Sequence, residues 1–252
     1  MIEKEVETRT PDGTADGLFY QPETGESSPG IFFLTDIGGI RPSQRAMAAR
    51  ICSEGYAVFM PNLFYRTGRP PLFEPGLKFG DEKFMKRMAE LSPPLTPEAV
   101  ERDTGSYVDF LGKHQAVKNG PFGAVGLCFA GQVVLRMAAA CPHQIAAGAS
   151  FHGGRLYTDA PTSPHLLLPR IKARLYFGHA TKDKSMPQES IDKFNNALQA
   201  WGGRYESEVY EGAQHGWTVT DSPAYSPPQA ERAFKTLKRL FAESLLSRPA
   251  SR

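Results

Sequence analysis

The stretch Gly123–Cys141, "GAVGLCFAGQVVLRMAAAC", places a single cysteine, Cys128, between a short apolar run and a helix-like segment. A nucleophile in such a setting is presented by a sharp strand-to-helix turn, which requires small residues two positions before and after it. Gly126 meets this requirement, and Ala130 stands where glycine is usual. The start of the following helix would favour a thiolate, and the backbone N–H of Phe129 would be an oxyanion donor.

The cysteine also has a plain structural interpretation. A free cysteine packs like a small hydrophobic residue, so the motif alone leaves a buried thiol as open as a nucleophile. The other two cysteines, Cys52 and Cys141, lie 76 and 13 positions from Cys128 and form neither a disulfide framework nor a C-x-x-C metal pair. We expect both to be packing residues.

Two later residues supply the partners that a cysteine nucleophile needs, in the chain order nucleophile, acid, histidine. Asp183 follows the apolar segment in "RLYFGHATKDKSMP", and His215 follows the next strand-like segment in "YESEVYEGAQHGW". His215 would take the thiol proton or pair with the thiolate, and Asp183 would orient the imidazole. Either residue alone could be an ordinary loop residue, but all three in this order favour a catalytic triad.

The loop in "FLTDIGGI" is the place where such enzymes carry their second oxyanion donor. The backbone N–H of Ile37 or Gly38 could serve in that role. Asp36, next to them, could control the protonation of the resting thiol, or it could be a turn residue before the glycines.

Four further residues are candidates for contacting a substrate. His152 in "SFHGG" follows an apolar run, although a structural hydrogen bond from its imidazole is the competing interpretation. Tyr65 and Arg66 follow the run "YAVFMP" and either line the mouth of a pocket or form an exposed loop pair. Trp217 lies two positions after His215.

These residues need a scaffold that brings distant loops together. Short apolar runs of strand type alternate with amphipathic segments of helix type. The predicted strands are 2–10, 14–22, 29–36, 56–64, 122–128, 145–153, 171–179 and 205–212, and the predicted helices are 43–55, 81–91, 96–115, 130–141, 186–202 and 228–246. The pattern predicts an α/β fold: a mostly parallel sheet with helices on both faces, preceded by an antiparallel hairpin around "PDG". In such sheets reactive groups follow the carboxyl ends of strands, where all three triad candidates stand.

The composition and charge of the chain exclude several classes of protein. The 252 residues carry 29 basic and 27 acidic side chains, a net charge of +2, which is too balanced for an electrostatic nucleic-acid binder. No apolar run reaches the roughly 18 residues of a membrane span, and the start "MIEKEVETRT" has no signal-like apolar region. We expect one domain over 1–252 in the cytoplasm, as a monomer or small homo-oligomer, with a loop and a helical cap-like segment within 62–117 and a frayed tail at 246–252.

The chain resembles the dienelactone hydrolase family of the α/β-hydrolase superfamily. The matching stretches, in family order over about residues 25–245, are "LTDIGGI", "YAVFMPNLFYRTG", "VGLCFAGQ", "SFHGG", "GHATKDKSMP" and "YEGAQHGW". The resemblance implies a Cys128–His215–Asp183 triad that cleaves an ester or lactone through a thioester, without metal or cofactor. It also implies an acid at position 36 that binds the resting thiol, here an aspartate where the family has glutamate. The family's arginine shortly after the histidine is absent from "GWTVTD".

The leading hypothesis is therefore a carboxylic ester hydrolase acting on a small ester or lactone. A non-catalytic small-molecule binding or sensing protein on the same scaffold is the alternative, motivated by Ala130 and the absent arginine. A thiol redox sensor at Cys128 is a third, for which the sequence offers no resolving cysteine nearby.

Overall fold

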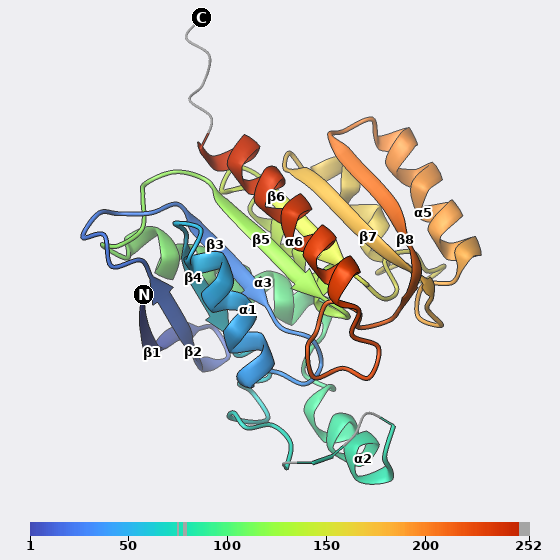
Figure 1. Cartoon of the computed structure of the whole chain (residues 1–252), viewed down its shortest axis with the longest axis horizontal. Helices are drawn as coiled ribbons and strands as arrows, with labels where there is room; N and C mark the ends of the chain where they lie inside the picture. The colour runs from blue at the N-terminus through green and yellow to red at the C-terminus, as the bar shows by residue number, and fades with distance from the viewer. Residues whose placement is uncertain (75, 78–79, 247–252) are drawn as a thin grey trace, which may run out of the picture.

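The computed structural model describes residues 1–74, 76–77 and 80–246, and its eight strands form one sheet in the order β1-β2-β4-β3-β5-β6-β7-β8 (Figure 1). The strands are β1 (Ile2–Thr10), β2 (Gly13–Gln21), β3 (Gly30–Leu34), β4 (Ala57–Pro61), β5 (Phe122–Leu127), β6 (Ile145–Phe151), β7 (Arg174–Lys182) and β8 (Tyr205–Gln214). β1 and β2 pair antiparallel, β2 also pairs antiparallel with β4, and all pairs from β4 to β8 are parallel. The predicted α/β fold with an N-terminal antiparallel hairpin is confirmed.

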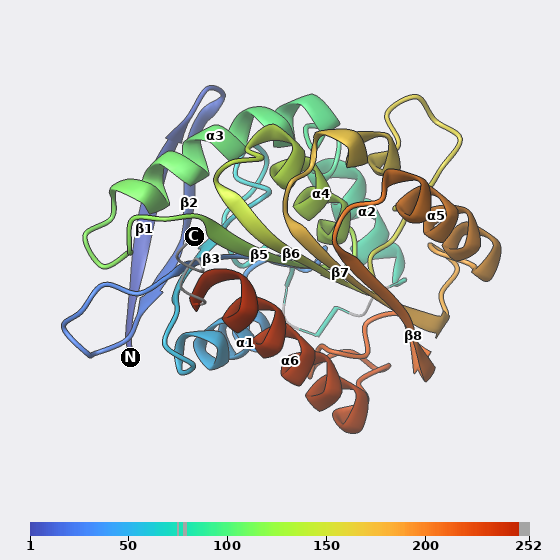
Figure 2. The ribbon, with the colours of Figure 1, turned by 90° about the horizontal axis from the view of Figure 1, so that it is seen from above.

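Helices cover both faces of this sheet. They are α1 (Pro42–Cys52), α2 (Glu82–Leu91), α3 (Pro97–Lys113), α4 (Ala130–Ala140), α5 (Gln188–Trp201) and α6 (Pro227–Phe241), with a 3₁₀ helix at Pro164–Arg170 and a π-helical turn at Ala242–Leu246. Figure 2 shows α1 and α6 on one face and α3, α4 and α5 on the other. None of the helices within the described residues has the length and hydropathy needed to cross a membrane.

The core is divided by the sheet into two apolar clusters. In β5, Ala124 packs in the cluster that contains α4 and α5, whereas Val125 and Leu127 pack in the cluster that contains α1 and α6. All six residues of β5 are buried. This burial on both faces explains why the central strands are continuous apolar runs rather than alternating ones.

The first residues of α3 and α1 show two ways in which the local sequence starts a helix. The hydroxyl of Thr96 accepts the N–H of Ala99 at 3.2 Å, so Thr96, the first residue of the predicted helix 96–115, is the N-cap of α3. α1 begins one residue before the predicted helix 43–55: Pro42 is its first residue, and Ser43 lies in the first turn. Proline is favoured at this position because its missing N–H is not needed there. The expected frayed tail at 246–252 lies outside the described residues except for Leu246, which ends the π-helical turn.

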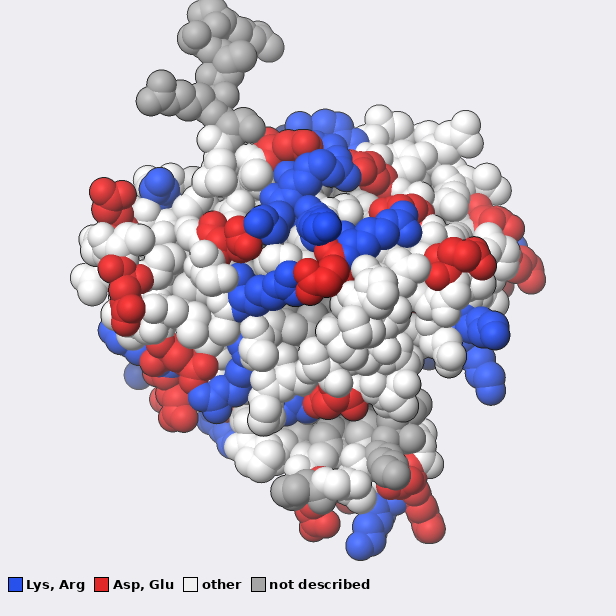
Figure 3. Space-filling model, viewed as in Figure 1, with Lys and Arg blue, Asp and Glu red and all other residues white. Residues whose placement is uncertain are grey.

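The face that carries α1 and α6 bears charges of both signs. Figure 3 shows Lys and Arg interspersed with Asp and Glu on this side rather than one field of a single sign. Several of these charges are ion pairs across neighbouring elements, including Arg50–Glu231, Lys238–Glu54 and Arg239–Glu206. Such exposed pairs contribute little to stability, but they leave the surface locally neutral.

Tyr65 and Arg66 take part in a buried polar network that joins the β1–β2 turn to α3. Arg66 binds Asp103 of α3 through Nη1 and Nη2 at 2.8 and 2.7 Å, and binds Asp12 of the turn at 2.7 Å. The hydroxyl of Tyr65 donates to Asp103 at 2.9 Å. The guanidinium of Arg66 is thus bound by two carboxylates. Through it, the β1–β2 turn is linked to α3.

We predict that Arg66→Met lowers the free energy of unfolding by about 3 kcal/mol, because it leaves the buried carboxylate of Asp103 without its cation. The side chains of Arg66 and Asp103 are only 11% and 6% exposed. Lys113→Met is the control, since it breaks a pair with Asp109 in which the two side chains are 79% and 70% exposed. Urea denaturation measures both, and equal losses for the two variants would contradict the assignment.

Candidate active site

Cys128 lies at the sharp corner between β5 and α4. Its backbone is in the left-handed region, with φ 57°, a conformation that costs free energy for a residue with a side chain. Gly126 makes the corner possible, because a Cβ at that position would lie 2.2 Å from the carbonyl oxygen of Ala130. The side chain of Cys128 is half-buried and stays accessible at the end of the strand.

The alanine at position 130 is compatible with this corner. Its side chain is fully buried in the apolar cluster around α4. The close approach that requires glycine falls one residue later, at Gly131, where a Cβ would lie 2.2 Å from the hydroxyl of Ser150 and 2.8 Å from the Cα of Gly153. The glycine that such a turn needs is therefore present, displaced by one position.

Cys128, His215 and Asp183 meet at one edge of the sheet. The Nε2 of His215 lies 3.0 Å from the Sγ of Cys128, and its Nδ1 lies 2.6 Å from Oδ2 of Asp183. The three residues directly follow β5, β8 and β7, respectively. Parallel neighbouring strands end at the same edge, so residues 87 positions apart along the chain become hydrogen-bond partners.

Ser185 fixes the carboxylate of Asp183, a contact that the sequence interpretation missed. Its N–H and its hydroxyl both donate to Oδ1, at 2.8 and 2.6 Å, which leaves Oδ2 for His215. The signal was available, because a serine two positions after an aspartate is the spacing of an Asx turn.

The electrostatics of the three residues follow from these bonds. Burial by itself lowers the pKa of His215, but hydrogen bonds to Asp183 and Cys128 outweigh it and raise the pKa to about 10. Burial would raise the pKa of Asp183, but the hydrogen bond from His215 holds that pKa below its usual value. At neutral pH the imidazole is therefore protonated and the carboxylate ionised.

The loop after β3 is anchored by Asp36. Its carboxylate accepts Arg41 Nη2 at 2.8 Å, Gln44 Nε2 at 3.2 Å and the backbone N–H of Gly38 at 2.9 Å. Of the two N–H groups considered for an oxyanion donor, that of Gly38 is thus engaged by Asp36, which leaves Ile37 as the candidate on this loop. Both carboxylate oxygens of Asp36 therefore have hydrogen-bond partners within residues 38–44.

Arg41 connects this loop to the loop that carries His215. Beyond Asp36, its guanidinium binds Asp221 through Nε and Nη2 at 2.8 and 3.1 Å. One cation therefore spans two carboxylates from segments 180 positions apart. The bridge holds the candidate oxyanion loop against the segment that follows His215.

His152 lies beneath the corner, not open to solvent. It is 1% exposed, and its Nδ1 accepts the backbone N–H of Cys128 at 3.1 Å. Because Nδ1 is an acceptor, the proton is on Nε2, which donates to the hydroxyl of Thr218 at 2.8 Å. Burial holds the pKa of His152 well below its usual value, so the ring is neutral. Trp217 is also fully buried, with its ring 5.0 Å from that of His152.

The four substrate candidates are thus buried or bound to other protein groups, and His152 directly contacts the triad residues Cys128 and His215. His152 and Trp217 are buried behind Cys128 and His215, and Tyr65 and Arg66 are bound in the network with Asp103. Phe129, the candidate oxyanion donor, is half-buried directly after Cys128. Within the part of the chain that the structure describes, no cluster of three or more His, Cys, Asp or Glu side chains could hold a metal ion.

An eight-stranded, mostly parallel sheet with a cysteine at the sharp corner after β5 and a histidine after the last strand defines the α/β-hydrolase class. Residues 15–245 match the model of the dienelactone hydrolase family, and the chain belongs to that family. This membership confirms the family resemblance and the predicted class of hydrolase.

Named relatives agree with this assignment. A carboxymethylenebutenolidase from Rhodococcus opacus is 29% identical over 214 residues, which cover 84% of this chain and 79% of the relative. Hydrolase tropI from Talaromyces stipitatus is 30% identical over 205 residues, covering 79% of this chain and 74% of the relative. The solved structure of a dienelactone hydrolase-like promiscuous phosphotriesterase, P91, from metagenomic libraries aligns with a TM-score of 0.78 and 18% identity, covering 96% of this chain and 98% of that one. At that identity the last likeness shows the fold alone.

We predict that Gly126→Ala lowers the free energy of unfolding by about 1–3 kcal/mol, because the added methyl collides with the carbonyl of Ala130. Gly105→Ala is the matched control: Gly105 lies in α3 with open space around it, and alanine there should stabilise by up to about 1 kcal/mol. Chemical denaturation measures both. Equal stability of the two variants would show that the corner tolerates a side chain.

A second prediction concerns pH. The folded pKa of His215, about 10, lies above the roughly 6.5 of an unfolded histidine, so protonation favours the folded state. This contribution is complete below about pH 6.5 and is lost as the pH rises through 10. The free-energy difference between wild type and His215→Gln should therefore shrink between pH 6.5 and 10.

Replacing the exposed His143 by glutamine provides the control, because His143 lies outside this set of bonds. A His215→Gln difference that stays constant or grows over the same pH range would contradict the prediction.

Proposed function

We propose that this protein hydrolyses a small carboxylic ester or lactone, with Cys128 as nucleophile and a thioester as covalent intermediate. The observation that carries the proposal is the position of His215, 3.0 Å from the thiol sulfur and 2.6 Å from the carboxylate of Asp183. This is the geometry of a nucleophile, a base and an orienting acid.

The first half of the proposed cycle forms the thioester. The thiolate is the reactive form of cysteine, and His215, with Nε2 3.0 Å from the sulfur, is placed to take the thiol proton and pair with the thiolate. The thiolate attacks the carbonyl carbon, and the N–H groups of Phe129 and Ile37 stabilise the oxyanion that forms. His215 then gives its proton to the departing alkoxide, which leaves as the alcohol; in a lactone it remains attached to the acyl group.

The second half releases the acid. Neutral His215 takes a proton from water, the resulting hydroxide attacks the thioester carbonyl, and the sulfur leaves as the thiolate. The products are the carboxylic acid and the alcohol, or the hydroxy acid from a lactone. Nucleophile, base and oxyanion donors all come from the chain, so the proposed cycle needs no metal or cofactor.

Other residues named from the sequence take supporting roles in this proposal. Asp36 and Arg41 hold the loop of Ile37 in place rather than acting on the thiol. His152 is a positioning residue: its neutral Nδ1 holds the N–H of Cys128 and so helps to fix the left-handed corner. The names of the carboxymethylenebutenolidase relatives support a lactone as the substrate.

We predict that Cys128→Ala lowers kcat/KM by at least about 10³-fold on any ester or lactone that the wild type cleaves. The substrate panel should hold activated esters and lactones, each with and without a free carboxylate. Cys141→Ala is the matched control, because Cys141 is also a half-buried free cysteine and should keep wild-type kcat/KM. Rapid-quench mass spectrometry should detect the acyl group on Cys128.

Full activity of Cys128→Ala on every cleaved substrate would reject the nucleophile. Steady turnover by the wild type would reject the non-catalytic sensing alternative, and the absence of turnover across the whole panel would favour it.

A further inference from the structure

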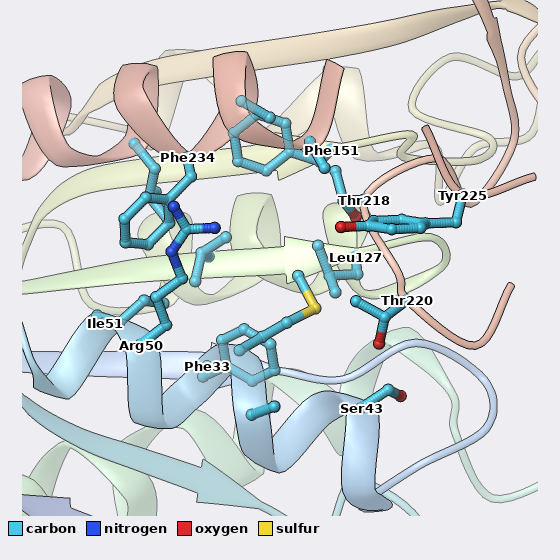
Figure 4. A pocket seen from close by; sticks show the side chains of 16 residues that line it. Phe33, Ser43, Arg50, Ile51, Leu127, Phe151, Thr218, Thr220, Tyr225 and Phe234 are labelled. Carbon is cyan, nitrogen blue, oxygen red and sulfur yellow. The ribbon is translucent and has the colours of Figure 1, made fainter. Parts of the chain in front are cut away.

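A cavity of about 150 Å³ lies between α1 and α6, against the sheet strands β3, β5 and β6 (Figure 4). Its walls are mainly apolar, with Phe33, Met47, Ile51, Leu127, Phe151 and Phe234 among the lining residues. Neither Cys128 nor His215 lines it. The cavity is therefore distinct from the candidate active site, although Leu127 and Phe151 directly precede Cys128 and His152.

The two ends of the cavity differ chemically. Figure 4 shows the side chains of Ser43, Thr218, Thr220 and Tyr225 gathered at one end, and those of Arg50 and Phe234 at the other. All four residues at the first end carry hydroxyl groups, which can donate to or accept from a ligand hydroxyl or carbonyl.

The cavity does not offer an uncompensated charge. Arg50 is the charged side chain among its described lining residues, and both of its Nη atoms bind the carboxylate of Glu231 at 2.6 Å. Its guanidinium also lies 3.7 Å from the ring centroid of Phe234. A charged ligand would lose hydration here without gaining a counter-ion, so the cavity favours an uncharged one.

We propose that this cavity is a second ligand site, for an uncharged molecule of about benzene size with one hydroxyl or carbonyl group. An apolar cavity of about 150 Å³ is large enough for benzene. The ring would fill the apolar middle, and the polar group would reach the hydroxyl end formed by Thr218, Thr220 and Tyr225.

The site is joined to the catalytic corner by a short chain of hydrogen bonds. The hydroxyl of Thr218 accepts from Nε2 of His152 at 2.8 Å, and Nδ1 of His152 accepts the N–H of Cys128 at 3.1 Å. Thr218, Thr220 and Tyr225 also belong to the segment 215–226, which begins with His215 and leads into α6. A bound ligand packs against the segments that position both the nucleophile and the base.

This coupling rests on the proposed function, whereas binding does not. A ligand in the cavity packs against its apolar walls, and these added contacts order the walls. A more ordered Thr218 holds His152, and thereby the Cys128 corner, in its working geometry. Occupancy should therefore raise kcat while leaving KM unchanged.

Phenol is the probe for binding. Benzoate, which has a ring of the same size but carries a negative charge, is the negative control. Ligand-observed NMR on the full chain should show saturable phenol binding at ~1 mM or tighter and no benzoate binding. Ala230→Leu on α6 and Ala46→Leu on α1 enlarge side chains that line the cavity, at a half-buried and an exposed position, and should abolish phenol binding. Ala197→Leu, a half-buried alanine on α5, should leave it intact.

Binding that survives in both cavity-filling variants, or no phenol binding to the wild type, would overturn the site. Circular dichroism of each variant verifies folding. Because the two variants are on different helices, one of them still tests the site if the other fails to fold. The phenol-binding measurement tests the site even if the protein cleaves no ester.

The rate measurement tests the coupling. With a cleaved ester, saturating phenol should raise kcat of the wild type at least two-fold at constant KM, and this effect should disappear in Ala230→Leu. A rise in KM that is the same in wild type and Ala230→Leu would place phenol at Cys128 and overturn the proposal. Phenol binding with unchanged kcat would overturn the coupling.

Discussion

The hydrogen-bonded row from Asp183 through His215 to Cys128 sets the requirements that the surrounding structure meets. Its two bonds, 2.6 and 3.0 Å long, form only if the ends of β7, β8 and β5 lie at one edge of the sheet in register. The parallel order of these strands, with helices filling both faces, provides that register. The raised pKa of His215 and the lowered pKa of Asp183 follow from the same two contacts.

A second layer of polar contacts keeps this row in place. The left-handed backbone of Cys128 is held by its own N–H, which is shared between the carbonyl of Phe151 and Nδ1 of His152. Arg41, bridging Asp36 and Asp221, holds the loop of Ile37 against the segment after His215. The strained backbone of Cys128 is thus held by bonds to residues 151–152, and strain of this kind is common at functional sites.

The sequence determined much of the fold and the identity of the central residues. Continuous apolar runs alternating with amphipathic helices give a two-faced parallel sheet, because each run must be covered on both sides. Cys128, Asp183 and His215 could be selected because each follows such a run, and Gly126 because a tight corner excludes side chains. Thr96 and Pro97 also determine the start of α3 through contacts within one helical turn.

Only the tertiary structure decided which residues that lie far apart in the chain become hydrogen-bond or ion-pair partners. Sequence placed Asp36 beside a possible thiol, but its nearest cation, Arg41, and the link to Asp221 appear only after folding. It placed His152, Arg66 and Trp217 near a pocket, whereas only folding shows that His152 and Trp217 are buried and that Arg66 binds Asp103. Spacing along the chain reveals which strand end a residue follows. It does not reveal which way the side chain turns, because that depends on the charges and hydrogen-bond donors that distant segments bring to it.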